Sequence, residues 1–241
     1  MEILSFDVYG DYGHFRKFYT TSSPLTFSTI PPTAVYGLLG AILGLPKENN
    51  QYLLEINSNT TRIAIQVLKP IKKVHIGINH LNTKNHFWAP KASKGARTQI
   101  RTEFLKAVGF RIYVQMNSKP LFTQLIEMVR EHQNVYTICL GLSELLADFS
   151  FHQVQEGTLK TNPEWITTKT VIPISLIHEQ KIRIEAGLQI LKEKQPIHMN
   201  HNREVLQYES LLFDSSGKPI TAVIREYVEL AGTEEKIVFC N

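Results

Sequence analysis

Apolar and polar residues follow one another along the first half of the chain in patterns that predict four strands. In these segments apolar residues alternate with polar ones or form short unbroken runs, and β-branched and aromatic residues are frequent. We expect strands around Phe6, over Thr61–Lys69, over Phe110–Met116 and, as a buried strand, over Val135–Gly141.

Two other segments have the residue spacing of helices. Pro120–His132 has a proline in its opening turn, and its apolar face is formed by Leu121, Leu125, Met128 and Val129. Ile30–Pro46 is apolar but contains Gly37, Gly40 and Gly44, each of which costs a helix roughly 1 kcal/mol relative to alanine. Because these glycines fall on one narrow face, we expect that face to pack closely, against either the core or another subunit.

The order strand, helix, strand, insertion, strand, helix, strand predicts an α+β fold. It is the order of a ferredoxin-like domain, with an antiparallel sheet and two helices on one face, and the insertion covers about residues 70–100. After Gly141 short apolar segments are separated by turn-forming residues, which indicates strands. We therefore predict a domain over 1–141 and a smaller β-rich part over 142–241, which is either a β subdomain or a second ferredoxin-like unit.

The polar loop before the first helix contains two features suited to RNA. Gly10–Gly13 has the GxxG spacing, which is most often only a turn, and it leads into side chains that can pair phosphates or stack on bases, namely His14, Phe15, Arg16, Lys17 and Tyr19. Phe15 and Tyr19 could equally well be core residues. At the helix start, Pro31 and Pro32 would leave the amides of Thr33 and Ala34 free to hold a phosphate.

Charge is distributed unevenly along the chain. The net charge is only +4, yet no acidic residue occurs between Glu55 and Glu103. The cations of this segment are Arg62, Lys69, Lys72, Lys73, Lys84, Lys91, Lys94, Arg97 and Arg101. Such a long acid-free segment favours a nucleic-acid partner over the alternative of a solvated basic face, and Phe87 and Trp88 among the cations suit stacking on unpaired bases.

The sequence contains none of the common motifs for metal, nucleotide or hydrolase chemistry. Cys139 and Cys240 are far apart and no CxxC pair occurs, so we expect no metal site and no cofactor. Histidine remains the catalytic candidate, because metal-free RNA cleavage needs an acid and a base near neutral pH. The candidates are His75, His80 and His86, but no spacing among them identifies an acid–base pair.

The N-terminus and the cysteine content indicate a cytoplasmic protein. The first residues lack the basic start and apolar run of a signal peptide, and the chain has only two cysteines. The longest uncharged apolar run, Ala34–Leu45, is too short to cross a bilayer, so we expect no membrane partner.

The run GDYGHFRKFYTTSSPLTFSTIPPTAVYGLLGAILGL resembles the N-terminal signature of the CRISPR-associated (Cas) family numbered five, a subunit of the type I Cascade surveillance complex. The shared features are Gly13, Phe15 and Arg16, a Thr/Ser-rich loop, then Pro31-Pro32-Thr33 opening a helix with Gly37, Gly40 and Gly44. The segments RTEFL and VYTICLGLSELLADF resemble later parts of the family, so the resemblance covers roughly the first 150 residues. The FRKFYTTSSPLTF loop is most similar to type I-B members.

The resemblance implies a ferredoxin-like, RNA-recognition-type domain with a basic β-hairpin thumb inserted between its second and third strands. It implies a protein that holds the 5′ handle of the CRISPR RNA, contacts the large and backbone subunits, and meets target DNA only through the complex. One subtype also cleaves the precursor RNA with a tyrosine, a lysine and a histidine, which do not align here. We therefore expect binding without chemistry and keep metal-independent RNA cleavage as the alternative. The expected RNA-binding residues are Tyr12, His14, Arg16, Lys17, Thr33, Lys84, His86, Trp88, Lys91, Lys94, Arg97 and Arg101.

Overall fold

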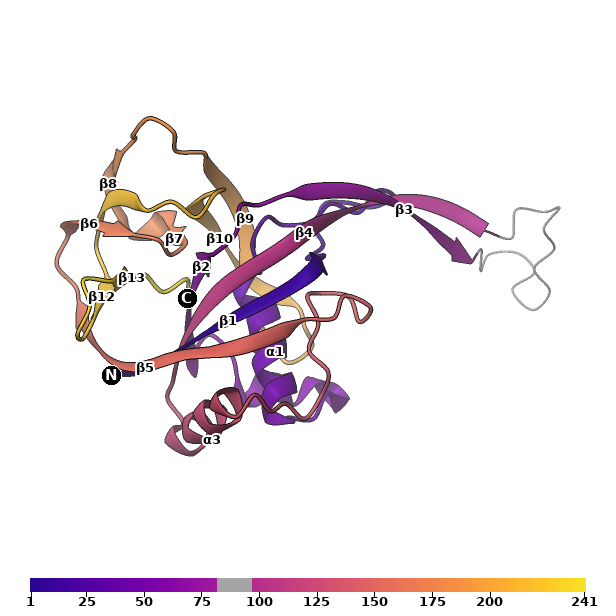
Figure 1. Cartoon of the computed structure of the whole chain (residues 1–241), viewed down its shortest axis with the longest axis horizontal. Helices are drawn as coiled ribbons and strands as arrows, with labels where there is room; N and C mark the ends of the chain where they lie inside the picture. Colours follow the sequence, from indigo (N-terminus) through magenta and orange to yellow (C-terminus); the bar gives the residue numbers. More distant parts are fainter. Residues whose placement is uncertain (82–96) are drawn as a thin grey trace.

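A large antiparallel sheet forms the centre of the molecule (Figure 1), as a computed structural model of residues 1–81 and 97–241 shows. Within these residues the sheet has seven strands in the order β13-β12-β5-β1-β4-β2, with β3 paired to β4. The strands are β1 (Glu2–Gly13), β2 (Thr61–Val67), β3 (Lys73–Leu81), β4 (Arg97–Met116), β5 (Asp148–Lys160), β12 (Tyr227–Leu230) and β13 (Lys236–Ile237). The fold is thus mixed α/β and mostly sheet.

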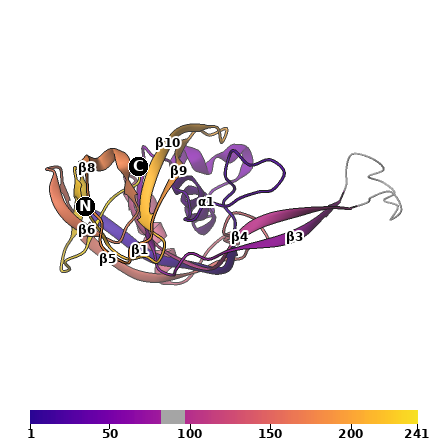
Figure 2. The ribbon, with the colours of Figure 1, turned by 90° about the horizontal axis from the view of Figure 1, so that it is seen from above.

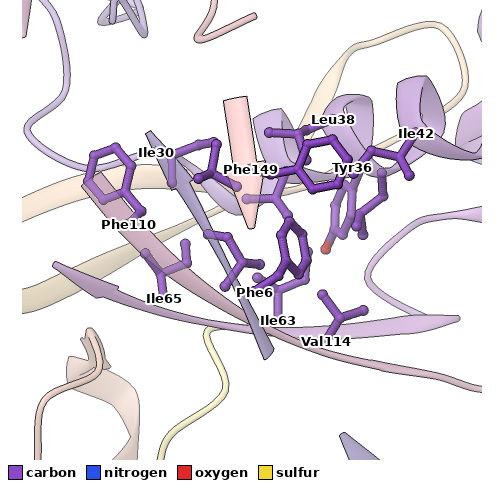
Figure 3. Close-up of a cluster of buried hydrophobic side chains, with 14 of the residues drawn as sticks. Phe6, Ile30, Tyr36, Leu38, Ile42, Ile63, Ile65, Phe110, Val114 and Phe149 are labelled. Atoms are coloured by element: carbon purple, nitrogen blue, oxygen red, sulfur yellow. The ribbon is translucent and has the colours of Figure 1, made fainter. Parts of the chain in front are cut away.

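Helices cover one face of this sheet. They are α1 (Pro32–Leu43), α2 (Tyr52–Glu55) and α3 (Lys119–Arg130). The described residues also form the short 3-10 helices η1 (Glu48–Asn50) and η3 (Ile174–Leu176). Alternate residues of β1, such as Phe6 and Val8, point towards α1 and are completely buried. Figure 3 shows Phe6 and Val114 of the sheet in the same cluster as Tyr36 and Ile42 of α1. None of the described helices is both long and apolar enough to cross a membrane.

The C-terminal part adds two small sheets, β7-β10-β9 and β6-β11-β8. Their strands are β6 (Glu164–Thr168), β7 (Ile172–Pro173), β8 (Ile177–Arg183), β9 (Ile190–Met199), β10 (Val205–Asp214) and β11 (Ile220–Ile224). As Figure 2 shows, β9 lies beside α1. The Tyr36 hydroxyl of α1 donates a hydrogen bond to the Ile197 carbonyl of β9, at 3.3 Å. Helix α1 therefore packs against the central sheet and also contacts β9 of the C-terminal part.

The prediction of a buried strand over Val135–Gly141 is wrong. This segment is irregular, and Val135 and Tyr136 are about half exposed. Their backbone amides donate hydrogen bonds to the carbonyl oxygens of Ile42 and Ala41 in the last turn of α1. The segment therefore caps the helix and does not pair with a strand. The strand next to β1 is instead β5, so the central sheet extends past residue 141.

The expected turn at Gly10–Gly13 is also wrong, because these residues are the end of β1. Gly10 is paired with Val108, and Gly13 with Leu105 of β4. A Cβ atom at Gly10 would lie 2.9 Å from the backbone oxygen of Leu146, so glycine permits a close approach of two chain segments here.

The three glycines of the first helix have different surroundings. Gly44 is the C-cap with φ 73°, a conformation that glycine adopts without steric cost, and a Cβ there would lie 2.7 Å from Val135 Cγ2. A Cβ at Gly40 would lie 3.1 Å from Tyr52 Cβ, whereas a Cβ at Gly37 would meet no described atom within 4 Å. A Cβ would therefore be crowded within the chain at Gly40 and Gly44 but not at Gly37, where the contact with another subunit stays a prediction.

Candidate nucleic-acid interface

A long two-stranded ribbon, formed by β3 and the first half of β4, projects from the body of the molecule (Figure 1). The antiparallel pairing runs from Lys73 opposite Leu105 to Leu81 opposite Arg97. Directly opposed residues share a face of such a ribbon, and successive residues alternate between faces. The acid-free insertion predicted from the sequence therefore begins and ends in this ribbon.

The two faces of the ribbon differ in chemistry. One face is mainly polar and carries His75, Asn79, Arg97, Gln99, Arg101 and Glu103. The other is mainly apolar and carries Val74, Ile76, Ile78, Ile100 and Phe104. Arg97 and Arg101 are exposed and lie four positions apart on β4, so the polar face presents two guanidinium groups to the solvent.

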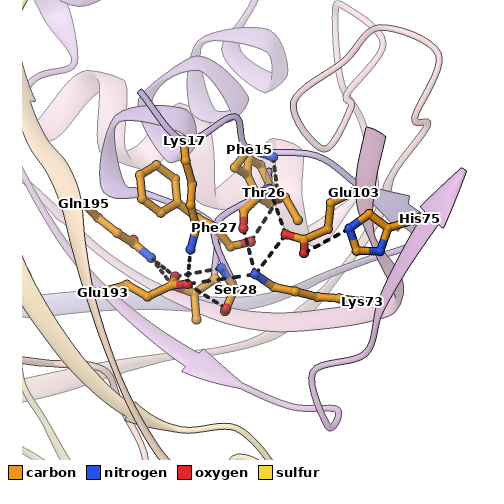
Figure 4. A network of polar contacts seen from close by, with 11 residues as sticks. Phe15, Lys17, Thr26, Phe27, Ser28, Lys73, His75, Glu103, Glu193 and Gln195 are labelled. Carbon is orange, nitrogen blue, oxygen red and sulfur yellow. Dashed lines mark hydrogen bonds and ion pairs between the residues drawn. The ribbon is translucent and has the colours of Figure 1, made fainter. Parts of the chain in front are cut away.

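Glu103 joins the base of the ribbon to the polar loop that precedes α1 (Figure 4). Its Oε1 accepts hydrogen bonds from the Thr26 amide at 3.0 Å and from Lys73 Nζ at 3.2 Å. Lys73 Nζ also donates to the Thr26 carbonyl at 2.8 Å, and His75 Nε2 lies 3.8 Å from Glu103 Oε2. The loop is thus held against the polar face where the ribbon leaves the sheet.

Glu193 of β9 holds the other side of the same loop. Its carboxylate accepts hydrogen bonds from Lys17 Nζ at 2.9 Å and from both the amide and the hydroxyl of Ser28 at 2.8 Å. Gln195 Nε2 donates to Glu193 Oε2 at 3.3 Å. Since Lys17 and Glu193 are only 14% and 10% exposed, this is a largely buried ion pair between the loop and the C-terminal part.

The surroundings of this ion pair shift both pKa values. Burial alone would raise the pKa of Glu193, but the Ser28 amide and the Lys17 ammonium outweigh it and hold that pKa below its ordinary value. Burial alone would lower the pKa of Lys17, but the Glu193 carboxylate outweighs it and raises that pKa. Both groups are therefore charged at neutral pH.

The exposed part of the loop is shaped by Arg16. Its guanidinium donates hydrogen bonds to the Thr20 carbonyl at 2.8 Å and the Thr21 carbonyl at 3.3 Å, and the side chain remains exposed. Arg16 thus both closes the loop and keeps donors available at the surface. Lys17, predicted to pair with phosphate, is instead occupied by Glu193.

The structure contradicts the predicted base-stacking role of His14. The residue is 4% exposed, its Nδ1 lies 2.7 Å from the Glu103 carbonyl, and its ring packs against Phe104. Tyr12 is half-buried and packs edge-to-face on the same Phe104 ring. Phe15 is buried, so of its two predicted roles, stacking on a base or packing in the core, the structure shows the core role.

The phosphate site expected at the start of α1 is also contradicted. Thr33 is only 7% exposed, and the Ala34 amide donates a hydrogen bond to the Pro31 carbonyl at 2.9 Å. Five other predicted residues lie outside the described residues, namely Lys84, His86, Trp88, Lys91 and Lys94.

Sequence reasoning missed both glutamates that organise this region. A weak signal existed for Glu103, because it is the first acidic residue after the acid-free segment. Strand alternation places Glu193 on the same face as the core-facing residues Leu191 and Ile197. A carboxylate that points toward the core needs a cationic partner. No sequence pattern identifies that partner as Lys17.

The first half of the chain matches a known protein family. Residues 3–142 match the model of the family described as CRISPR-associated protein (Cas_Cas5). The chain belongs to this family. The matched residues include the polar loop, α1, both strands of the ribbon and α3. No curated protein sequence gives a significant match.

Solved structures similar to this Cas5-family chain include a crystal structure of a CRISPR protein from Archaeoglobus fulgidus. That likeness has a TM-score of 0.56 and 15% sequence identity, and it covers 100% of both chains. A chain of a CRISPR RNA-guided surveillance complex is also similar, with a TM-score of 0.49, 11% identity and coverage of 95% of this chain and 91% of that chain. At 15% sequence identity, the likeness to the Archaeoglobus fulgidus protein shows a shared fold.

The histidines considered for RNA cleavage do not form a pair among the described residues of this Cas5-family chain. His75 and His80 both lie on β3, but an odd number of positions separates them, so they face opposite sides of the ribbon. His86 lies outside the described residues. Within the two described ranges, no cluster of three histidine, cysteine, aspartate or glutamate side chains is arranged to hold a metal ion.

Proposed function

We propose that the protein is a non-catalytic, RNA-binding subunit of a type I CRISPR effector complex, the Cascade complex, and that it holds the 5′ handle of the CRISPR RNA. Its protein partners in this proposal are the large subunit and the backbone subunits, and it meets target DNA only through the complex. Membership of the Cas5 family supports this setting.

The polar face of the β3–β4 ribbon is the observation that carries the proposal. Arg97 and Arg101 are exposed on it, in a segment without acidic residues between Glu55 and Glu103. Guanidinium groups on an extended surface pair with successive phosphates of a single strand. We propose that this ribbon is the thumb and that RNA lies along its polar face.

The strand order supports a ferredoxin-like interpretation of the first domain. Strands β5, β1, β4 and β2 are neighbours in that order, while α1 lies between β1 and β2 in sequence and α3 between β4 and β5. We propose a ferredoxin-like domain to which residues 1–141 contribute three strands, both helices and the ribbon. Strand β5, from the β-rich part over 142–241, completes its sheet.

One assay tests the proposal against RNA cleavage and against a purely protein-binding role. A labelled repeat RNA is incubated with the protein without metal and analysed on native and denaturing gels in parallel. We expect a shifted, intact RNA whose binding weakens steeply with salt. A discrete cleavage product would show an endoribonuclease, and no shift at low salt would show that the protein does not bind the RNA by itself; either result contradicts the proposal.

A further inference from the structure

Three aromatic rings from both halves of the chain meet at the surface. Phe18 and Tyr19 of the polar loop are 55% and 60% exposed. The Phe18 ring lies 4.8 Å from the ring of Tyr208, on β10, and 5.2 Å from the ring of Tyr19. We call these three residues the aromatic surface.

Hydrogen bonds and an ion pair hold the aromatic surface in place. Arg16 donates to the carbonyls of Thr20 and Thr21, which closes the loop around Phe18 and Tyr19. Lys17, the residue before Phe18, is anchored to Glu193 of β9, the strand that pairs with β10. The rings are therefore presented by a fixed loop on a sheet, and binding would cost little ordering entropy.

Cationic side chains occur next to the aromatic surface. Lys194 Nζ lies 5.6 Å from the centre of the Tyr208 ring, and Arg16 is exposed in the same loop. Lys192, two positions before Lys194 on β9, is exposed as well. Exposed rings beside cations are suited to a ligand with flat π-faces and negative charges, which describes an unpaired nucleotide better than an apolar peptide.

We infer that Phe18, Tyr19 and Tyr208 form a stacking site for an unpaired base of single-stranded RNA, with Arg16 and Lys194 on the flanking phosphates. This inference rests on the proposed RNA-binding function and adds a second point of contact, formed by residues outside the ribbon. Because Tyr208 and Lys194 belong to the C-terminal part, both halves of the chain contact the RNA.

The test separates bases from phosphates. Binding is measured by fluorescence anisotropy with two labelled probes of about ten nucleotides, a length within the usual site sizes of single-strand binders. One probe is oligoadenylate, and the other is an abasic ribose-phosphate oligomer of equal length. Wild type is expected to bind oligoadenylate roughly 10-fold or more tightly than the abasic oligomer, since stacking is substantial for each base.

The Phe18→Leu/Tyr208→Leu variant is expected to lose most of this preference while it still binds the abasic oligomer as wild type does. Phe18→Tyr, which keeps a ring, is expected to retain the preference, and circular dichroism checks that each variant is folded. Arg101→Gln on the ribbon is expected to weaken binding of both probes equally.

Each failure has a distinct meaning. If wild type binds neither probe at low salt, the proposed function itself fails. If wild type binds and Arg101→Gln weakens binding, but the double variant keeps the full preference for oligoadenylate, only the stacking site is overturned. A double variant that binds RNA normally but no longer assembles with other subunits would identify the aromatic surface as a protein contact and would also overturn the inference.

Discussion

Lys17 Nζ and Glu193 Oε1 lie 2.9 Å apart, and their ion pair joins two residues that are 176 positions apart in the chain. The pair links the polar loop to β9, while Glu103 and Lys73 link the same loop to the base of the ribbon. The loop is consequently held from both sides, and the ribbon and the aromatic surface keep a defined spacing.

Replacing the buried carboxylate should destabilise the protein strongly. Glu193→Gln leaves the Lys17 ammonium without its counter-charge in a largely buried place, and breaking such a pair costs about 3 kcal/mol or more. We expect a loss of that size in the free energy of unfolding, measured by urea denaturation. Glu185→Gln, at an exposed position before β9, is the matched control and should change stability little. Equal stability of the two variants would contradict a structural role for the pair.

The contribution of this pair should also depend on pH. The pKa of Glu193 is lower in the folded protein than its ordinary value of 4.5, so its ionised form stabilises the fold at and above that pH. The stability difference between wild type and Glu193→Gln should stay constant from neutral pH to about 4.5 and then shrink as pH falls through the folded pKa. Urea titrations over this range measure it; a difference that shrinks only at alkaline pH would contradict the assignment.

The glycines of α1 should respond differently to alanine. Gly37→Ala should raise the free energy of unfolding by up to about 1 kcal/mol, because alanine favours the helix and its Cβ would meet no described atom within 4 Å. Gly44→Ala should lower it by about 1 kcal/mol or more, because φ is 73° and Val135 lies in the way. Thermal unfolding of both variants checks this, and stabilisation at Gly44 would contradict it.

The two cysteines should differ in reactivity. Burial raises the pKa of Cys240 to about 12, and the residue is only 2% exposed, so its thiolate is scarce at neutral pH. Burial also raises the pKa of Cys139, although that residue is half-buried. A colorimetric thiol reagent at pH 8 should therefore label Cys139 slowly and Cys240 hardly at all until the protein is unfolded. Rapid labelling of Cys240 in the folded protein, seen by peptide mass spectrometry, would contradict this.

The arginines of the ribbon should contribute to RNA affinity through phosphates. Arg97→Gln and Arg101→Gln should each weaken binding of repeat RNA and reduce the slope of log affinity against log salt by roughly 0.7. Lys119→Gln, at an exposed position at the start of α3, is the matched control and should leave the slope unchanged. The same loss in all three variants would point to a non-specific effect of net charge.

Local patterns predicted most of the first half of the fold. Alternation located β1, β2 and the second half of β4, and amphipathic spacing located α3, because apolar residues of each of these elements pack into the core cluster that also contains α1. The strand expected over Val135–Gly141 failed because an apolar run can also cap a helix, and the pattern does not say which partner its amides find. The C-terminal part was predicted only as β-rich, since short strands leave their pairing undetermined.

The candidate site, like the fold, was predicted only in part from the sequence. The sequence by itself determined the acid-free basic segment, the arginines that it carries and the family, because these depend on residue type and order along the chain. Only the tertiary structure decided that His14 and Thr33 are buried, that Lys17 is neutralised by Glu193, and that Phe18 meets Tyr208. The reason is physical: burial and ion pairing depend on which distant segments fold against each other, and a local pattern contains no information about a partner 176 positions away.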